Sequence, residues 1–358
     1  MNLGNYFLQS FRIVLLPLAI IYGVIVRCRN FMYDRQWLKS TSFNLPIICV
    51  GNLSVGGTGK SPMIEFLIKR LLINYKPAIL SRGYKRKTKG YLLANDKSTA
   101  LEIGDEPMQF YQKFPEVPIA VGEQRITAIP LLLQDSRDIQ VLLLDDAFQH
   151  RAIHPGFSIL LSDYADLFTR DFYLPTGNLR DDKSSYKRAD IIIITKCCPA
   201  ISLDEKLAIS DEINCLPHQS LFFSSIIYGK PYHILEKNNI RNFDKETDVL
   251  LVSGIANIAP IKKLLSQQTH GYDQLNYADH HIFTIEDIKE MEYRHKKLNN
   301  NNSIILTTEK DAVRLIKFKE NIEHLPIYVL PIEHTILFDE EAALMERIHH
   351  FIEKFKYH

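Results

Sequence analysis

The sequence predicts an α/β fold, in which a mostly parallel sheet with flanking helices is accompanied by a smaller second α/β domain and an apolar N-terminal helix. The first observation is a series of short runs, several apolar on both faces, that alternate with helix-length amphipathic stretches. Parallel strands buried on both faces and joined by helical crossovers give this pattern. The runs span residues 47–50, 78–80, 119–121, 141–144, 158–161 and 191–194, and later 249–252, 304–307 and 327–330.

The second observation is a polar, Lys- and Asn-rich passage near residues 215–245, which interrupts this series. A composition shift of this kind is typical of a domain boundary. We therefore predict three parts: residues 1–40 form the N-terminal helix and its flank, residues 41–220 the first α/β domain, and residues 221–358 the smaller C-terminal domain. A chain of 358 residues, 46% of them hydrophobic, is long enough for two such domains.

The overall charge of the chain gives no indication of a nucleic-acid partner. Lys and Arg number 43 against 42 Asp and Glu, so the formal net charge is +1, whereas nucleic-acid binders usually carry a marked basic excess. Any bound anion must be held locally. The five cysteines lack the paired spacing of a zinc or redox site, which favours reduced thiols.

The N-terminal helix has the pattern of a membrane-surface segment. Residues 13–26 carry no charge, and Arg27, Arg29 and Arg35 follow with aromatic residues between them. The run is shorter than the roughly 20 apolar residues of a spanning helix and contains Pro17. A helix lying in the interface, with its cations near the headgroups, fits better. A buried core helix is the alternative.

A glycine-rich turn after the first strand is the strongest local signal. It lies between the apolar strand that ends near Val50 and a helical pattern that begins at Lys60, which is the context of a phosphate-binding loop. Lys60 would reach the β- and γ-phosphates of a nucleotide, and the Ser61 hydroxyl would bind Mg²⁺. The pattern predicts a fold of the P-loop NTPase type. The loop residues are Ser54, Val55, Gly56, Gly57, Thr58 and Gly59, of which Ser54 stands where the general motif has glycine.

Two acidic residues, Asp145 and Asp146, end the apolar run 141–144. In P-loop proteins a carboxylate at the end of a neighbouring strand organises Mg²⁺ and its waters. A strand that ends in a solvated turn is the alternative when this motif stands alone. His150 follows closely, and it would donate to a phosphoryl oxygen, position a carboxylate or serve only as a structural histidine.

Further polar clusters fall at predicted loops. Arg82, Tyr84 and Lys85 follow the run 78–80, at the strand end where open α/β sheets bind ligands, and would clamp an acidic substrate or form a solvated loop. Asp105 precedes a helix, where its ordinary role is an N-cap. Arg180 would neutralise transition-state charge or make a surface ion pair.

The second domain contributes a pair of adjacent histidines, His280 and His281. Neighbouring residues of a strand point in opposite directions, so the two side chains do not bind one metal together. One of them would assist a proton acceptor if this domain closes over the nucleotide. Farther along, the segment Thr307 to Asp311 ends an apolar run and is predicted to cap a helix over Ala312–Phe318.

The joint presence and order of these motifs resemble the tetraacyldisaccharide 4′-kinase family, the lipid A 4′-kinases of Gram-negative bacteria, over nearly the whole chain. Ser54 belongs to that family's own version of the loop. Besides the apolar N-terminal helix, the resemblance rests on VGNLSVGGTGKSP (50–62), LSRGYKRK (80–87), GDEP (104–107), LLDDAFQHR (143–151), GNLR (177–180), ITKC (194–197), ADHH (278–281) and TEKDAVR (308–314).

The resemblance implies that ATP, with Mg²⁺, phosphorylates the 4′-hydroxyl of a tetraacyl glucosamine disaccharide 1-phosphate, which gives lipid IVA. It further implies a peripheral or monotopic enzyme on the cytoplasmic side of the bacterial inner membrane. The partners it implies are the lipid A precursor and that membrane face, with no nucleic acid and no known protein partner.

The resemblance also implies roles for individual residues. Asp105 accepts or guides the proton of the attacking hydroxyl, with His280 as its partner. Asp145, Asp146 and His150 surround the metal and the γ-phosphate, with Ser61 and Asp146 as metal ligands. Arg180 corresponds to a charge-stabilising arginine, and Tyr84 to a tyrosine that contacts substrate or nucleotide. Asp181 follows Arg180 where the family often has glutamate, so its role stays open.

Two other functions compete with this hypothesis. A membrane-docked P-loop ATPase or GTPase would use hydrolysis as a conformational switch, but it needs neither the basic cluster at 81–87 nor a carboxylate aimed at a hydroxyl. A soluble small-molecule kinase would bury the N-terminal helix. A scaffolding protein has no use for Lys60, Ser61, Asp145 and Asp146 together.

Overall fold

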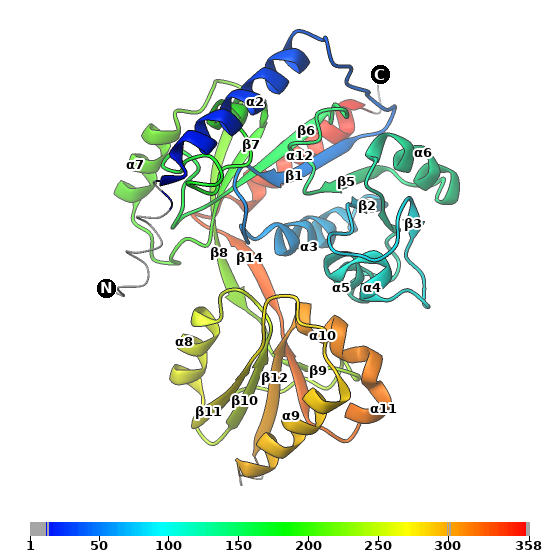
Figure 1. Cartoon of the computed structure of the whole chain (residues 1–358), viewed down its shortest axis with the longest axis vertical. Helices are drawn as coiled ribbons and strands as arrows, with labels where there is room; N and C mark the ends of the chain where they lie inside the picture. Colours follow the sequence, from blue (N-terminus) through cyan, green and yellow to red (C-terminus); the bar gives the residue numbers. More distant parts are fainter. Residues whose placement is uncertain (1–11, 13, 299, 301, 356–358) are drawn as a thin grey trace.

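Two sheets organise the chain in the computed structural model, which describes residues 12, 14–298, 300 and 302–355 (Figure 1). Residues 1–11 and Ile13, which belong to the predicted N-terminal part, lie outside these residues, as do Asn299, Asn301 and residues 356–358. We call the larger sheet with its helices the first lobe, and the smaller sheet with its helices the second lobe. Figure 1 shows the two lobes one above the other, joined by β8 and β14.

Within the described residues the first lobe has a nine-stranded sheet in the order β14-β8-β7-β6-β1-β5-β2-β4-β3. Its strands pair in parallel except for β14 with β8 and β3 with β4. The strands are β1 (Ile47–Asn52), β2 (Pro77–Ser81), β3 (Leu92–Leu93), β4 (Ile119–Val121), β5 (Val141–Asp145), β6 (Phe157–Asp163), β7 (Ile191–Thr195), β8 (Ser220–Tyr228) and β14 (Ile332–Ile336).

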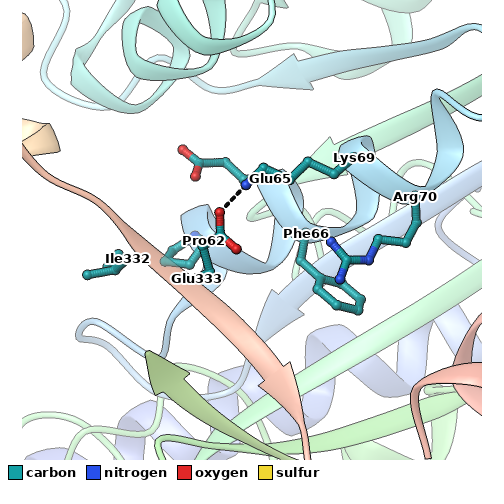
Figure 2. Close-up of a pocket in the computed structure, with 7 residues that line it drawn as sticks. All are labelled: Pro62, Glu65, Phe66, Lys69, Arg70, Ile332 and Glu333. Atoms are coloured by element: carbon teal, nitrogen blue, oxygen red, sulfur yellow. Dashed lines mark hydrogen bonds and ion pairs between the residues drawn. The ribbon is translucent and has the colours of Figure 1, made fainter. Parts of the chain in front are cut away.

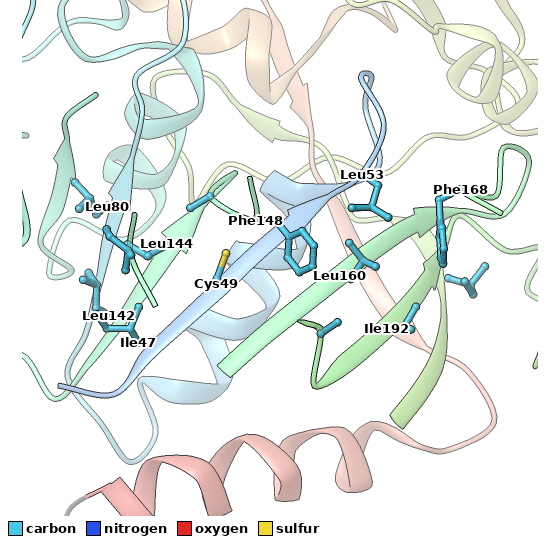
Figure 3. Close-up of a cluster of buried hydrophobic side chains, with 14 of the residues drawn as sticks. Ile47, Cys49, Leu53, Leu80, Leu142, Leu144, Phe148, Leu160, Phe168 and Ile192 are labelled. Atoms are coloured by element: carbon cyan, nitrogen blue, oxygen red, sulfur yellow. The ribbon is translucent and has the colours of Figure 1, made fainter. Parts of the chain in front are cut away.

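Helices cover both faces of this sheet, because alternate residues of each central strand are apolar on opposite sides. In β1, Ile47 and Cys49 pack with α6 and α7 in one core, part of which Figure 3 shows, while Ile48 and Val50 pack with α3, α5 and α12 in the other. The helices of this lobe are α2 (Leu16–Asp34), α3 (Lys60–Leu71), α4 (Ala100–Ile103), α5 (Asp105–Lys113), α6 (Arg125–Asp135), α7 (Leu203–Ile213), α12 (Glu341–Phe355) and the 3₁₀ helix η1 (Lys183–Arg188).

The second lobe repeats this arrangement on a smaller scale. Its described strands form a five-stranded sheet in the order β11-β10-β12-β13-β9, parallel except for β9. Helix α8 packs on one face and α9, α10 and α11 on the other. The elements are β9 (Tyr232–His233), β10 (Asp248–Ser253), α8 (Ala259–Gln268), β11 (Gly271–Asn276), α9 (Ile285–Lys297), β12 (Ser303–Thr308), α10 (Glu309–Leu315), η2 (Ile316–Phe318), α11 (Lys319–Ile322) and β13 (Ile327–Leu330).

The predicted α/β architecture is confirmed, and every apolar run that the sequence analysis singled out lies within a strand. The predicted division at residue 220 differs from the observed topology. Strand β8 begins at Ser220 and joins the first sheet, and β14 and α12 return to it from the C-terminal segment. The pairing of β14 with β8 spans more than 100 residues of sequence, so no local pattern could indicate it.

Helix α2 packs on the first lobe by one face only. Ala19, Gly23, Val26 and Asn30 are buried at helical spacing, and a Cβ at Gly23 would lie 2.6 Å from the ring of Tyr173. The described part of the chain contains no helix with the length and apolar character needed to cross a bilayer. The exposed apolar side chains of this region are Val14, Leu16, Leu18, Ile20, Ile21, Val24, Ile25 and Phe31.

Helix α5 of the first lobe packs against α10 of the second through complementary charges. Glu106 accepts from Lys310 (2.8 Å), and Lys113 lies between the buried carboxylates of Glu65 (2.5 Å) and Glu309. Burial and the neighbouring Glu65 raise the pKa of Glu309 to about 7, while burial likewise raises that of Glu65 against the effect of Lys113. The ammonium group of Lys113 thus pairs with two carboxylates, one from each lobe.

Lys113→Met should lower the free energy of unfolding by about 3–5 kcal/mol, because two buried carboxylates lose their cation. Protonation relieves this loss: carboxyls with raised folded-state pKa values favour the folded chain at low pH, and this contribution disappears as pH rises through the folded pKa. In urea unfolding, the loss of unfolding free energy in Lys113→Met relative to the wild type should therefore be larger at pH 8 than at pH 5. Lys76→Met, which breaks the exposed pair with Asp138, is the control and should unfold like the wild type. An equal deficit at both pH values would contradict the prediction.

Candidate active site

The glycine-rich loop connects β1 to α3, as predicted. Gly56 and Gly59 have φ values of +113° and +85°, which other residues rarely adopt. The front of the loop is tied to the segment 177–180, because Val55 N donates to the Asn178 carbonyl (2.8 Å) and Ser54 forms a bridge with Leu179. The loop is therefore held by the backbone of a segment more than 100 residues away.

The loop leaves room for an anionic ligand. An added Cβ at Gly56 or Gly57 would meet nothing within 4 Å. Among the described residues, none bonds to the buried hydroxyl of Thr58. Open backbone and an unpaired donor at the start of a helix are features that fit a phosphate group.

Lys60, Asp146 and Arg180 converge at the end of β1, around Asn52. The Lys60 Nζ lies 3.0 Å from Asn52 Oδ1 and 3.5 Å from Asp146 Oδ1. Arg180 donates through Nη1 to Asp146 Oδ2 (3.0 Å) and through Nη2 to Asn52 Oδ1 (2.6 Å) and Asp146 Oδ1. Asn52 thus fixes the separation of the two cations, and Asp146 neutralises part of their charge.

The two adjacent carboxylates have opposite electrostatic environments. Burial opposes the charge of Asp146, but Arg180 and Lys60 outweigh it and hold the pKa of this carboxyl at about 2. Burial and the neighbouring Asp146 raise the pKa of Asp145 to about 6, even though Ser81 donates to its Oδ2 at 2.9 Å. Burial also lowers the pKa of Lys60.

Ser61, Asp145 and Asp146 are the residues that could hold a metal ion. Mg²⁺ is usually bound by one or two carboxylates together with phosphate oxygens. Across the described ranges, no group of three or more His, Cys, Asp or Glu side chains has the arrangement of a metal site. Asp145 ends β5, Asp146 follows it and Ser61 lies in the first turn of α3, and carboxylate and hydroxyl oxygens of this kind fit a divalent ion.

A second cluster contains Asp105, His280, Arg314 and Tyr84. The Asp105 Oδ2 lies 2.8 Å from His280 Nδ1 and accepts from Arg314 Nη2 at 2.6 Å. The rings of Tyr84 and His280 meet edge to face, 6.0 Å apart. His281 is directed elsewhere, to Asp287 (2.9 Å).

The charge of Asp105 is held by the second lobe. Burial opposes it, but the hydrogen bonds from His280 and Arg314 outweigh burial and hold the pKa of Asp105 at about 2. Both donors bind Oδ2, so among the described residues Oδ1 accepts no hydrogen bond. Asp105 is the first residue of α5 and Gly104 is its N-cap, so the alternative capping role of Asp105 is wrong.

Other predicted site residues lie at the margin of these clusters. The His150 ring makes no hydrogen bond within the described chain, and burial and Arg125 lower its pKa. Arg82 is exposed, and the Lys85 ammonium lies 5.6 Å from the ring centre of Tyr84. Asp181 is buried and bonds to Asn30 (2.8 Å). The structure therefore brings Lys60, Asp146 and Arg180 together and, separately, Asp105, His280 and Tyr84.

Sequence reasoning missed Asn52 and Arg314. Both lie in motifs that were recognised, but only the fold shows that Asn52 joins Lys60 to Arg180 and that Arg314 reaches another lobe. The predicted capping segment does contain the N-cap of α10, since Thr308 accepts from Asp311 N, but the helix begins at Glu309 rather than at Ala312. A helix cap joins residues close in sequence and can be predicted from them. The contact of Arg314 with Asp105 joins residues 209 positions apart and cannot.

Comparison with known proteins decides the family. A family model described as tetraacyldisaccharide-1-P 4′-kinase matches residues 11–353. The chain belongs to the tetraacyldisaccharide 4′-kinase family. It is 46% identical over 347 residues to the tetraacyldisaccharide 4′-kinase of Bacteroides thetaiotaomicron, which covers 93% of this chain and 91% of that protein. The kinase of Flavobacterium johnsoniae is 44% identical over 331 residues and covers 91% and 93%.

The fold agrees with a solved member of the family. LpxK from Aquifex aeolicus, determined in complex with ATP, superposes with a TM-score of 0.74 at 28% identity, over 96% of this chain and 99% of that one. The resemblance seen in the sequence motifs is thus confirmed for family and fold.

Replacing Arg314 should raise the pKa of Asp105, because the guanidinium that donates to this carboxylate is lost. In Arg314→Met, ¹³C detection of the labelled carboxyl should show a midpoint above the value of about 2 expected for the wild type. Arg294→Met, which removes an exposed arginine of α9, is the control and should leave the midpoint unchanged. An unshifted midpoint in Arg314→Met would show that Arg314 does not stabilise the Asp105 charge.

Proposed function

We propose that this chain transfers the γ-phosphate of ATP to the 4′-hydroxyl of a tetraacyl glucosamine disaccharide 1-phosphate and so forms lipid IVA in lipid A biosynthesis. One observation carries the proposal: Asp105 of the first lobe meets His280 of the second, beside Tyr84 at the end of β2. A carboxylate held in this way, near the phosphate-binding loop, has the chemistry needed to receive a sugar hydroxyl.

We infer that the two clusters belong to one site. Glu106 follows Asp105 at the start of α5, and its charge contributes to the raised pKa of Asp145. Ser81, which bonds to Asp145, ends β2 and precedes the segment of Tyr84. We infer from this that the phosphate cluster and the Asp105 cluster face a common space at the carboxyl ends of β1, β5 and β2, where parallel sheets bind ligands.

Phosphoryl transfer depends mainly on positioning and on charge around the γ-phosphate. Lys60 and Arg180, separated by Asn52, would neutralise the oxygens of the transferred group. Ser61 and Asp146 would hold Mg²⁺, which would supply additional positive charge to the nucleotide phosphates. Asp105 Oδ1 would orient the hydroxyl and accept its proton as the new bond to phosphorus makes that hydroxyl acidic.

A hydrolytic switch explains this arrangement less well. Its water needs no binding surface for a sugar, whereas here Tyr84, His280 and Arg314 surround the carboxylate from two lobes. The pairing of Asp105 with both donors keeps it ionised at every working pH, which suits a fixed hydroxyl acceptor.

We further propose that α2 docks on the cytoplasmic face of the bacterial inner membrane as a peripheral or monotopic helix. Its outer face is apolar, with Ile21 57% and Ile25 60% exposed. The helix also adjoins the site, because Tyr22 donates to the Arg180 carbonyl at 3.0 Å. An acylated substrate held in the bilayer would then lie close to the phosphate-binding loop.

The arginines of α2 differ in part from their predicted role at the headgroups. Arg27 bonds to Asp182 at 2.8 Å and Arg29 to the Gln149 carbonyl at 2.9 Å, so both tie the helix to the first lobe. The Arg27 side chain stays 68% exposed and can still attract anionic lipid.

Transfer of labelled γ-phosphate to a tetraacyl disaccharide 1-phosphate in detergent micelles tests the kinase. The wild type should label the lipid, Lys60→Met should not, and Asp105→Asn should be slowed by about 10²- to 10⁴-fold, because it loses its proton acceptor. Asp138→Asn, at an exposed carboxylate, is the matched control and should label normally. ATP hydrolysis without labelled lipid would instead support the switch.

Flotation with vesicles that contain anionic lipid tests the docking of α2. Ile21→Glu combined with Ile25→Glu should release the protein from the vesicles, since two charges would enter the apolar interface. Ile73→Glu, at a residue 76% exposed beyond the end of α3, should bind as the wild type does. Equal binding of all three proteins would refute the assigned surface.

A further inference from the structure

A buried histidine, His334, lies behind the phosphate-binding loop. It belongs to β14, the strand that follows β13 of the second lobe and pairs with β8 in the first. Its side chain is 3% exposed, with Nε2 2.9 Å from the Gly59 carbonyl and Nδ1 3.1 Å from the Ser224 hydroxyl. No sequence motif pointed to this residue.

The hydrogen bonds define the state of the imidazole. A carbonyl only accepts, so Nε2 carries the proton and donates to Gly59, while Nδ1 accepts from Ser224. Burial lowers the pKa of His334 to about 4, in agreement with a neutral ring. Ser224 thereby selects the tautomer that can reach the loop.

His334 holds the peptide that leads directly into Lys60. Gly59 is the N-cap of α3, and its carbonyl also accepts the first intrahelical bond, from Met63 N at 3.1 Å. The preceding carbonyl, of Thr58, accepts from the Thr195 hydroxyl at 2.9 Å. Two successive carbonyls of the loop are thus anchored by buried side chains.

Anchoring these carbonyls directs the N–H groups of the loop. A trans peptide is planar, so its N–H points opposite to its carbonyl. When the carbonyls of Thr58 and Gly59 are held toward β7 and β14, the N–H groups of Gly59 and Lys60 are directed to the other side. In a phosphate-binding loop these N–H groups face the anion.

The contact between His334 and the loop is close and has further support along β14. A Cβ added to Gly59 would lie 2.9 Å from His334 Nε2, so the loop is in contact with this edge of the ring. Next to His334, Glu333 bonds to Lys69 of α3, and Figure 2 shows these two side chains between the helix and the strand. Ile332 N lies 3.4 Å from the Glu309 carboxylate of α10.

We propose that His334 is a positioning residue for the nucleotide phosphates, acting through the Gly59 peptide. The proposal rests on the proposed function only in that the loop binds ATP. Because β14 enters the first lobe directly after β13 of the second, His334 also makes the loop geometry depend on how that strand is placed. His334 touches no reacting atom in this role.

Binding of a non-hydrolysable ATP analogue with Mg²⁺, measured by calorimetry on the full chain, tests the proposal. His334→Leu fills the space without a donor and should weaken binding about tenfold, with a matching rise in KM for ATP and a KM for the lipid within twofold of the wild type. His334→Gln restores an N–H donor and should recover binding to within about threefold.

The control is His295→Leu, which breaks a similar pair with Ser303 (3.0 Å) away from the loop. It should leave analogue binding unchanged. If His334→Leu does not fold, Ser224→Ala decides: freeing the tautomer should weaken analogue binding two- to threefold.

Unchanged analogue affinity in folded His334→Leu, or in Ser224→Ala where His334→Leu does not fold, would overturn the proposal. Equal losses in the Leu and Gln variants, with KM values for ATP and lipid raised alike, would also overturn it and indicate a purely structural histidine. The kinase proposal can fail separately, because analogue binding needs no lipid. A wild type that binds the analogue but does not label lipid would refute the proposed lipid acceptor and leave the role of His334 intact.

Discussion

The ionised carboxylate of Asp105 is the constraint on which the arrangement of the lobes depends. It is largely buried, and a buried charge is stable only when it is paired and hydrogen-bonded. Both of its charged or polar partners, His280 and Arg314, come from the second lobe. The first lobe therefore cannot keep this charge in place by itself, and the ion pairs between α5 and α10 hold the two lobes where the charge is satisfied.

The same logic separates the carboxylates of the site into different roles. Asp146 has two cations and stays ionised, whereas its neighbour Asp145 has a hydroxyl donor and a raised pKa of about 6. Asp105 is ionised but keeps one oxygen without a donor among the described residues. The three carboxylates thus differ in their charge and in the oxygens left to accept a hydrogen bond, because their partners differ.

Segments far apart in sequence fix the phosphate-binding loop from several sides. The segment 177–180 holds its front, Thr195 and His334 hold its carbonyls, and Tyr22 of α2 adjoins Arg180. Nucleotide, acceptor hydroxyl and membrane surface would therefore meet near one loop. With α2 docked as proposed, a substrate held in the bilayer would reach this loop without its acyl chains leaving the lipid.

The sequence by itself determined the elements and the chemistry that depend on neighbours in the chain. Apolar runs predicted the central strands, and the spacing of Gly56 to Ser61 predicted the loop. Both features depend on residues that are consecutive in the chain, so the sequence shows them directly. The motif resemblance also placed Asp105 with His280. It did not indicate β14, which pairs with a strand more than 100 residues away.

Only the tertiary structure decided which side chains complete the site. Asn52 between two cations, Arg314 on Asp105 and His334 behind Gly59 are all contacts across elements. It also decided that His280, rather than His281, reaches Asp105. Such contacts depend on how sheets and helices pack, and packing between distant segments leaves no periodic signal in the chain.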